Sequence, residues 1–578
     1  MSRRVLLFSG TVLVLSALAL SLSACGGGAS AAPVGPTPSY TLTAAALNPA
    51  SITAGNTSTS AISVTPTNGY SGSINLSCGN IAGGNAAPTC SFSTNPVVIT
   101  GTTAGTSILT VSTSISTPGG SYALTVTGSD TRSLTPRNGP QALSLTTAAV
   151  IQHIVVIFQE NRSPDNLFHD SNLISAGADI ASSGVNSLGQ TITLSPIDLG
   201  TAGSNPQTYD LDHSHTAFVS MYDFGLMNGA DQINCSSAAN TTCPSNPQFK
   251  YVNPTDVAPY FALAEQYTFG DRMFQTNEGP SFPAHQFILS GTSAPTATSD
   301  LFASENMSGG STAGCIALAG TTVELITPLG VQNASQYPCF EHATLTDLLD
   351  AAAISWRYYA PSAGSIWTAP DAINHICVPE TINGALTCTG TDWTNNVIIP
   401  QWQVLQDIAN GQLQQVSWVI PDGAQSDHAE SNDGSGPSWV ASIVNEIGNS
   451  PYWANTAIII TWDDWGGWYD HVAPKVINDG VSWGSGYVYG FRVPLIVVSP
   501  YAKAAYIAHT THDFGSILKF VETIFNLPSL GYADVPADDL SDCFNLTQTP
   551  ITFQKIPAPL DASYFINNQR PPTDPDDD

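Results

Sequence analysis

The sequence predicts two folded domains: a small all-β sandwich, then a larger α/β domain whose mostly parallel sheet is flanked by helices. Residues 40–128 carry almost no charge, and their short runs rich in Ser, Thr and Val are separated by glycine-containing turns, which is typical of a sandwich. From residue 148, strand-like and helical stretches alternate, which indicates a parallel sheet covered by helices. In that part, the apolar run Ala457–Ile460 is typical of a strand buried on both faces.

The composition excludes some classes of binding partner. The chain has 578 residues, enough for more than one domain with a large core. Its 14 basic and 44 acidic residues give a formal net charge of −30. Nucleic-acid binding needs a basic face, and adsorption to an anionic membrane needs polybasic contacts, so neither partner is expected.

The amino terminus, residues 1–24, has the features of a lipoprotein signal peptide. Arg3 and Arg4 precede the mostly apolar stretch Val5–Leu22, and the segment LSAC that ends at Cys25 resembles a bacterial lipobox. In such signals the chain is cleaved before the cysteine, so Cys25 is the expected lipidation site. An ordinary secretory signal or a short membrane anchor is the alternative, and each exports the protein to the cell envelope or beyond. No later stretch is apolar for long enough to span a bilayer, so the Cys25 lipid is the only membrane contact expected.

Residues 25–39 are rich in Gly, Ala, Ser and Pro and are predicted to be a flexible tether. The predicted sandwich contains NPASITAG, TPTNGYSGSINLSC and PTCSFSTNP, which resemble the immunoglobulin-like modules of exported bacterial proteins. That resemblance implies a spacer or adhesion module, with glycan binding as an alternative. Residues 129–147, which contain Pro136 and Pro140, are expected to link the two domains.

The second domain, residues 148–570, is predicted to begin with a strand at Ile151–Phe158. Further strand-like runs are Ser355–Tyr359, Val416–Ile420, Ala457–Thr461 and Val493–Val498. Helices are expected at Pro259–Thr268, Leu345–Ala353, Trp402–Asn410, Ser438–Ile447 and Phe514–Phe525. The tail, residues 571–578, is rich in proline and acidic residues and is predicted to be disordered.

The cysteines indicate local disulfides formed in an oxidising compartment. The close pairs are Cys78/Cys90, Cys235/Cys243, Cys315/Cys339 and Cys377/Cys388, which leaves Cys543 over. The connectivity stays open, because spacing alone does not prove it. A zinc site is only weakly indicated, since no Cys-x-x-Cys pair or His-x-x-x-His spacing occurs.

Two adjacent carboxylates, Asp463 and Asp464, follow the apolar run of the predicted buried strand. Successive strand residues point to opposite faces, so the two can serve one site only if the backbone bends, which Gly466-Gly467 permits. Ligands of α/β proteins bind beyond the carboxyl ends of strands, and paired carboxylates there indicate a metal ion. A solvated loop is the alternative. The polar segment 159–163, QENRS, follows the first strand of the domain in the same way.

The second domain contains seven characteristic segments in order: HIVVIFQENRSPDNLF, DLDHSH, NEGPSFPAHQFILSGT, SDHAE, TWDDWGGWYDHVAP, YGFRVPLIVVSPYAK and HDFGSILKFVETIFNL. Together they resemble the bacterial phosphoesterase family, which contains the non-haemolytic phospholipases C and the large secreted acid phosphatases. The segments extend from His153 to Leu527 and so cover most of the domain.

The resemblance implies an alkaline-phosphatase-like fold and one bound divalent metal ion. Carried over residue by residue, the metal ligands are Glu160, Asn161, Ser281, Asp463 and Asp464. Ser281 would be the nucleophile, because a serine hydroxyl becomes reactive when a base or metal lowers its pKa; an ordinary turn serine is the alternative. The Asn161 amide could also donate to a phosphoryl oxygen. Oxygen ligands permit calcium, magnesium, manganese or iron, so the identity of the metal stays open.

The resemblance also places histidines around the transferred phosphoryl group. His213 and His428 match the family positions, and His375 is a further candidate. They would donate hydrogen bonds to phosphoryl oxygens or protonate the leaving alcohol. For His375, His215 and His471, an ordinary core or surface role is an equal alternative.

The sequence therefore predicts an exported, metal-dependent phosphoesterase of phospholipase C or acid-phosphatase type, which hydrolyses phosphate mono- or diesters through a phosphoseryl intermediate. Departures from the family pattern are Pro164 in place of an aromatic residue, Pro283-Ala284-His285 where Pro-Asn-Arg is common, and an Asp-Asp pair where phospholipases more often have Asp-Glu. The preference for phosphate monoesters or phospholipids, the pH optimum and the oligomeric state stay open. The alternative is a catalytically inactive surface adhesion or glycan-binding lipoprotein.

Overall fold

The computed structural model describes residues 35–79, 81, 87–114, 117–132, 134–199, 209–237, 241–477 and 488–572. The expected signal peptide, the lipidation site Cys25 and the acidic tail from residue 573 lie outside the described residues. Within the described ranges, none of the helices combines the length and the apolar character that a bilayer crossing requires.

The first domain consists of two β-sheets packed face to face. One sheet has the order β1 (Ser39–Ala44), β3 (Thr57–Thr67), β7 (Gly105–Ser112), β5 (Thr89–Phe92). The other has the order β2 (Ser51–Thr53), β9 (Gln141–Ala148), β8 (Gly120–Asp130), β4 (Gly72–Gly79), β6 (Val97–Ile99). Alternate residues of β3, such as Ile62 and Val64, are buried between the sheets, as a half-buried strand requires. The disulfide Cys78–Cys90 joins β4 to β5 and so links the two sheets.

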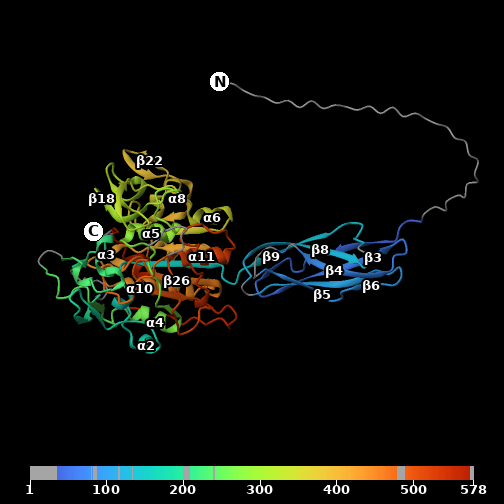
Figure 1. Ribbon diagram of the computed structural model, residues 1–578, viewed down its shortest axis with the longest axis horizontal. Coiled ribbons are helices and arrows are strands. Elements are labelled where there is room, and N and C mark those ends of the chain that lie inside the picture. Colours follow the sequence, from blue (N-terminus) through green and yellow to red (C-terminus); the bar gives the residue numbers. More distant parts are fainter. Residues whose placement is uncertain are drawn as a thin grey trace, which may run out of the picture.

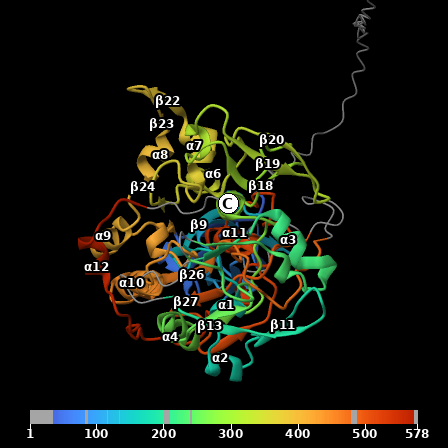
Figure 2. The same ribbon diagram turned by 90° about the vertical axis from the view of Figure 1, so that its left-hand side faces the viewer.

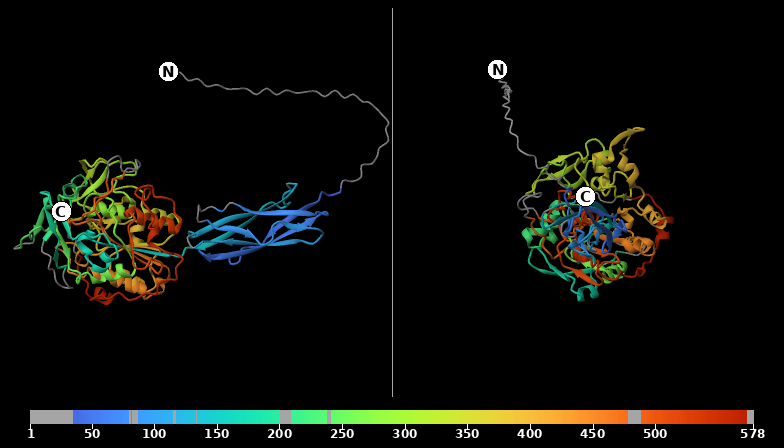
Figure 3. Two further views of the ribbon diagram at one scale, coloured as in Figure 1. Left: turned by 60° about the horizontal axis from the view of Figure 1, so that its bottom comes forward. Right: turned by 90° about the vertical axis from the view of Figure 1, so that its right-hand side faces the viewer.

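The boundary of the sandwich differs from the sequence prediction. Residues 129–147, expected to be a linker, include most of β9, which pairs antiparallel with β8 and parallel with β2. Leu145 and Thr147 of β9 are buried, so this alternating segment contributes to the sandwich. β9 ends at Ala148 and β10 begins at His153, so the connection is short. The sandwich accordingly lies on the amino-terminal side of β10 (Figures 1 and 3).

The second domain contains an eight-stranded mixed sheet. Its order is β24 (Val397–Ile398), β21 (Trp356–Tyr359), β25 (Val416–Val419), β10 (His153–Gln159), β26 (Thr456–Trp462), β27 (Leu495–Val498), β17 (Thr268–Gly270), β28 (Tyr506–Ala508). β27 is antiparallel to both of its neighbours, and the other strands share one direction. The sheet is therefore mostly parallel, as predicted. Each residue of β26 is buried, which confirms that helices cover both faces.

Two groups of helices cover the sheet (Figures 1 and 2). α5 (Ser281–Ser290), α6 (Leu345–Ala351) and α11 (Phe514–Phe525) lie on one side. α4 (Ala258–Gln266), α9 (Gln403–Ala409), α10 (Gly436–Gly448) and α12 (Ala562–Asn567) lie on the other. The helices expected at α4, α6, α9, α10 and α11 are present, whereas α5 lies in a segment that was not predicted to be helical.

Smaller elements surround this core. The short helices are α1 (Pro164–Leu167), α2 (Ser171–Ser175), α3 (His215–Tyr222), α7 (Asn374–Cys377) and α8 (Thr391–Asn396). The short strands are β11 (Ser183–Val185), β12 (Thr191–Thr193), β13 (Ser195–Ile197), β14 (Tyr209–Leu211), β15 (Cys235–Ser237), β16 (Lys250–Val252), β18 (Phe302–Ser308), β19 (Thr322–Ile326), β20 (Gln332–Gln336), β22 (Pro379–Ile382) and β23 (Ala385–Cys388).

The disulfides of this domain follow the predicted local pairing. The bonds are Cys235–Cys243, Cys315–Cys339 and Cys377–Cys388. Among the described cysteines, Cys543 is the one outside a disulfide, and it is buried.

Candidate active site

Three neighbouring parallel strands end at one edge of the sheet, and each is followed by polar residues. Glu160 and Asn161 come directly after β10, and Asp463 and Asp464 come directly after β26. β10 and β26 pair in register through Gln159 and Trp462, so the two polar segments start side by side. The segment that contains His428 follows β25, the other neighbour of β10. The edge predicted for a ligand is therefore where these side chains meet.

The backbone bends sharply behind both strands. Asn161 has a φ of 59°, in the left-handed region. Its backbone amide donates a hydrogen bond to Asp463 Oδ1 at 3.1 Å. Gly466 has a φ of 63°, and a Cβ there would lie 2.4 Å from the Asn161 carbonyl oxygen. Glycine is thus required for this close approach of the two loops. The bend predicted from Gly466-Gly467 is confirmed, and it allows both aspartates to serve one site.

Ser281 is the first residue of α5, and its hydroxyl lies between two carboxylates. Ser281 Oγ is 3.5 Å from Glu160 Oε2 and 3.3 Å from Asp464 Oδ2. α5 starts after Gly279-Pro280, and Pro283 lies in its first turn, where the helix needs no amide donor. The three side chains are completely buried, so their mutual positions are set by the packed core.

His285, which in the sequence is notable only as a departure from the family pattern, joins this group. Its Nε2 is 3.3 Å from Glu160 Oε1 and 3.9 Å from Asp463 Oδ2. Residues four apart on a helix share one face, so Ser281 and His285 project to the same side of α5. That spacing would have identified His285, had a helix been expected at this segment.

His213 and His428 lie together beside this group. Their ring centroids are 5.9 Å apart, and Asn161 Nδ2 is 3.0 Å from His213 Nε2. The Nδ1 atoms of His213 and His428 are 2.8 Å and 2.7 Å from the carbonyl oxygens of Leu211 and Ala429. Because a carbonyl oxygen only accepts, Nδ1 carries the hydrogen and each histidine presents Nε2. His428 Nε2 is buried and has no hydrogen-bond partner in the described part of the chain.

His375 is not brought into the group. It lies on α7, with Nδ1 2.8 Å from Glu341 Oε1 and Nε2 3.3 Å from Asp347 Oδ1. The hydrogen bond that His375 donates to Asp347, opposed by burial and assisted by Glu341, raises the pKa of His375 to about 9. His375 therefore lies in a partly exposed ion-pair cluster, which corresponds to the alternative surface role.

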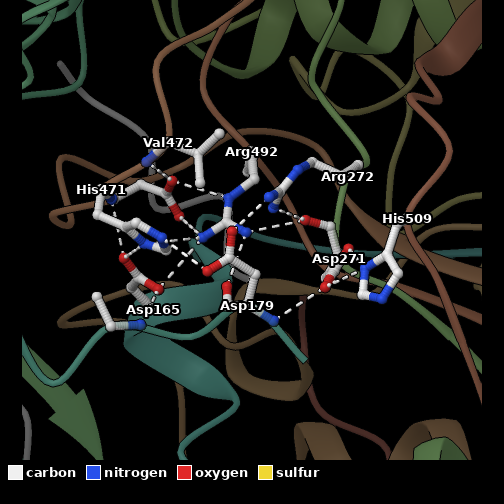
Figure 4. Close-up of polar contacts among 10 residues, drawn as sticks. Asp165, Asp179, Asp271, Arg272, His471, Val472, Arg492 and His509 are labelled. Atoms are coloured by element: carbon white, nitrogen blue, oxygen red, sulfur yellow. Dashed lines mark hydrogen bonds and ion pairs between the residues drawn. The ribbon is translucent and has the colours of Figure 1, made fainter. Parts of the chain in front are cut away.

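His471 and Asp165 belong to a buried ion-pair network behind the two loops (Figure 4). Arg492 is completely buried, and its Nε and terminal nitrogen donate to the two oxygens of Asp470 at 2.8 and 2.9 Å. The same terminal nitrogen is 3.2 Å from Asp165 Oδ1, and His471 Nδ1 is 2.7 Å from Asp165 Oδ2. Asp165 follows the Glu160–Asn161 loop and Asp470 follows the Asp463–Asp464 loop, so Arg492 holds the two loops together.

Arg162 and Asp427 support the third polar segment. The buried Arg162 guanidinium donates to the Asp427 carbonyl oxygen at 2.9 Å from Nε, and Tyr260 donates its hydroxyl to Asp427 Oδ2 at 2.8 Å. Burial raises the pKa of Asp427 to about 6, although Arg162, Tyr260 and Trp462 lower it. These contacts fix the backbone that carries His428.

The group fits a divalent cation. Donor atoms of Glu160, His285 and Asp463 lie within 4.8 Å of one another. Asp463 Oδ2 is buried and forms no hydrogen bond with a described residue, and the same is true of Asn161 Oδ1. Buried carboxylates are costly unless a positive charge accompanies them, and hard oxygen donors suit a divalent metal. Three of the five expected ligands, Glu160, Asp463 and Asp464, are such carboxylates.

Comparison with known proteins identifies the family of this chain. Residues 151–528, more than half of the chain, match the Phosphoesterase family, and the protein therefore belongs to that family. The chain is 25% identical over 419 residues to the hemolytic phospholipase C of Pseudomonas aeruginosa, which covers 65% of this chain and 53% of that protein. It is 23% identical over 463 residues to the non-hemolytic phospholipase C of Burkholderia pseudomallei, covering 70% and 61%.

A third relative is covered more completely. Phospholipase C B of Mycobacterium tuberculosis is 24% identical over 447 residues, which is 69% of this chain and 78% of that protein. Among solved structures, a protein in the alkaline phosphatase superfamily from Vibrio parahaemolyticus is 9% identical and covers 68% of this chain and 70% of its own. Its TM-score is 0.28, too low to support an argument about the fold.

Proposed function

We propose that the protein is a metal-dependent phosphoesterase that hydrolyses phosphate mono- or diesters with Ser281 as the nucleophile. The observation that carries the proposal is the position of Ser281 Oγ, 3.5 Å from Glu160 and 3.3 Å from Asp464, at the edge where Asp463 also lies. This arrangement places a hydroxyl beside bases that can accept its proton. The family membership and the relatives named phospholipase C support the same class of reaction.

In the proposed reaction, Ser281 Oγ attacks phosphorus as its proton passes to a neighbouring carboxylate. The bond from Oγ to phosphorus forms while the bond from phosphorus to the leaving oxygen breaks, which yields a phosphoseryl intermediate. Water then attacks phosphorus and releases Ser281. The amino end of α5 favours the negative charge of the phosphoryl group, because the helix dipole is positive there.

His213, His428 and Asn161 would bind the phosphoryl group, and the two histidines would protonate the leaving oxygen. Each histidine presents its Nε2 atom, and the side-chain amide of Asn161 lies 3.0 Å from Nε2 of His213. In protonated form each Nε2–H can donate to a phosphoryl oxygen or pass its proton to the leaving oxygen. His285 acts by position, since it contacts Glu160 from the face of α5 that carries Ser281. Catalysis would come mainly from positioning and charge stabilisation.

Glu160, Asn161, Ser281, Asp463 and Asp464 would hold one divalent metal ion within an alkaline-phosphatase-like fold. Such an ion would supply positive charge that lowers the pKa of the serine hydroxyl. The oxygen donors do not select among calcium, magnesium, manganese and iron.

We further propose that the enzyme is an exported lipoprotein. Residues 1–24 would be removed as a signal peptide, Cys25 would carry the lipid, and residues 25–39 would be a tether. The sandwich would be an immunoglobulin-like spacer, and residues 148–570 would form the catalytic domain.

The test compares the full chain on p-nitrophenyl phosphate and p-nitrophenyl phosphorylcholine from acidic to neutral pH. Ser281→Ala is expected to abolish turnover and keep the fold. Ser290→Ala is the matched control, because Ser290 is a buried serine of the same helix whose hydroxyl has no described hydrogen-bond partner. Dominant monoester hydrolysis indicates an acid phosphatase, and dominant phosphorylcholine release indicates a phospholipase C. A fully active Ser281→Ala variant excludes the serine mechanism, and inactivity of the parent after metal addition favours a binding lipoprotein.

A further inference from the structure

A second group of metal-binding side chains lies where the carboxyl-terminal segment packs against the start of α11. His512 stands two residues before α11, and Asp542 and Cys543 lie in a short 3₁₀ helix at Ser541–Cys543. His512 and Cys543 are buried, with exposed fractions of 1% and 0%. A nitrogen, a sulfur and a carboxylate oxygen from these three residues converge within 4.8 Å of one another.

The three donor atoms form a nearly regular triangle. Cys543 Sγ is 3.9 Å from His512 Nε2 and 3.6 Å from Asp542 Oδ1, and His512 Nε2 is 3.5 Å from Asp542 Oδ1. Tetrahedral zinc bonds of about 2.3 Å to sulfur and about 2.0–2.2 Å to nitrogen and oxygen place such donors roughly 3.4–3.6 Å apart. The observed separations are therefore within a few tenths of an ångström of those around a zinc ion.

The imidazole also has the support that zinc ligands usually have. His512 Nδ1 is 2.8 Å from Asp538 Oδ1, which fixes the hydrogen on Nδ1 and leaves Nε2 to face Cys543. Asp538 Oδ1 in turn accepts a hydrogen bond from Ser516 Oγ at 2.5 Å. A carboxylate behind the histidine is the arrangement that orients metal-bound imidazoles. Asp542 Oδ2 is buried and has no hydrogen-bond partner among the described residues.

We propose that His512, Asp542 and Cys543 bind a zinc ion that is separate from the metal of the proposed active site, with Asp538 as the supporting carboxylate. Sulfur, imidazole and carboxylate together suit zinc, whereas calcium and magnesium prefer oxygen ligands. The side chain of Asp542 is 25% exposed, so water can complete the tetrahedron from that side. The ion would join α11 to the carboxyl-terminal segment. It would also protect Cys543, the one described cysteine that is not in a disulfide, from oxidation.

Cobalt(II) is the probe for the test, because a thiolate bound to cobalt absorbs in the near ultraviolet. The full chain carries Cys25→Ser, and chelator-treated protein is titrated with cobalt chloride and then with zinc chloride. The proposed active site has no thiol among its described residues, so the thiolate band reports Cys543 alone. We expect a band that saturates within two equivalents of cobalt, because the proposed active site can also bind the ion, and that disappears when zinc is added.

Variants assign the ligands. Cys543→Ser is expected to remove the band, and Asp538→Asn to weaken cobalt binding about 10- to 100-fold while the band remains at saturation. Asp542→Asn keeps the Cys543 thiol and replaces Cys543→Ser as the ligand test if that variant does not fold. It is also expected to weaken cobalt binding. Asp463→Asn in the proposed active site is expected to leave the band unchanged, which separates the two sites. The proposal is overturned if the parent shows no band, or if Asp538→Asn and Asp542→Asn both bind cobalt as tightly as the parent.

Discussion

Ser281 and His285 lie one turn apart on the same face of α5, and both contact Glu160. Ser281 Oγ is 3.5 Å from Oε2 and His285 Nε2 is 3.3 Å from Oε1, so the two side chains hold the carboxylate from two sides. Glu160 comes from the end of β10, far from α5 in sequence. His285 is therefore in a position to orient the carboxylate that faces the serine.

His285→Gln is expected to lower kcat about 10- to 100-fold, because residues that orient a ligand carboxylate typically contribute that much. The measurement is turnover of the better p-nitrophenyl substrate, with circular dichroism to verify folding. His342→Gln is the matched control, since His342 is also buried but its Nδ1 contacts only the carbonyl oxygen of the next residue. If His285→Gln turns over at the parent rate, His285 does not position the site.

Asp463→Asn is expected to remove the retained active-site metal. The substitution keeps a side-chain oxygen that can accept the hydrogen bond from the backbone amide of Asn161, which is 3.1 Å away. It replaces the other oxygen, Oδ2, which has no hydrogen-bond partner among the described residues. The loss should thus reflect charge rather than misfolding. Elemental analysis of purified protein measures it, and Asp300→Asn, at an exposed position, is the control. Equal metal content in parent and Asp463→Asn contradicts the ligand assignment.

Arg492→Met is expected to lower the free energy of unfolding of the second domain by about 3–5 kcal/mol, since it leaves buried carboxylates without their partner. The carboxylates concerned are Asp470 and Asp165. Urea unfolding followed by tryptophan fluorescence measures the change. Arg272→Met, which removes a partly exposed ion pair with Asp179, should cost under about 1 kcal/mol. Similar losses in the two variants would show that Arg492 has no special role.

The stability of the protein is expected to fall as pH rises from 6.5 to 9. Burial lowers the pKa of His471, but the hydrogen bond and charge of Asp165, with Asp470, outweigh it and raise the pKa from 6.5 to about 9. The folded state thus binds the proton more tightly than the unfolded state, so the contribution is complete below pH 6.5 and is lost as pH passes 9. His375, whose pKa is also about 9, adds to the same window.

Urea midpoints at pH 6, 7.5 and 9 measure this dependence in the parent and in His471→Gln. The variant should show a shallower decline, because His375 and buried carboxyl groups such as Glu278, whose pKa burial raises to about 8, still lose protons in this range. Parallel curves would mean that protonated His471 does not stabilise the fold.

The position of the site at the ends of two strands was predictable, because both strands have the apolar sequence of a buried strand. The unbroken apolar runs before Glu160 and before Asp463 predict buried strands, and parallel strands bring their carboxyl ends to one edge. The direction of β27 was not predictable, because the run Leu495–Val498 is equally apolar in either orientation.

The helix at Ser281 and the location of His375 were harder to predict. Gly279-Pro280 and Pro283 are typical of a turn, yet Pro283 falls in the first helical turn, where proline is tolerated. His375 precedes a disulfide-linked segment, and only tertiary contacts with Glu341 and Asp347 decide that it pairs there. The alternation in Gln141–Ala148 was sufficient to predict a strand, but the nearby prolines favoured a linker.

The central strand β10 starts on the side of the sandwich and ends at the catalytic edge, about 23 Å further on for seven residues. The described chain enters the sandwich at its far end (Figure 1). The end of the sandwich at which the described chain begins and the edge that carries the candidate active site therefore lie at opposite ends of the molecule (Figure 1).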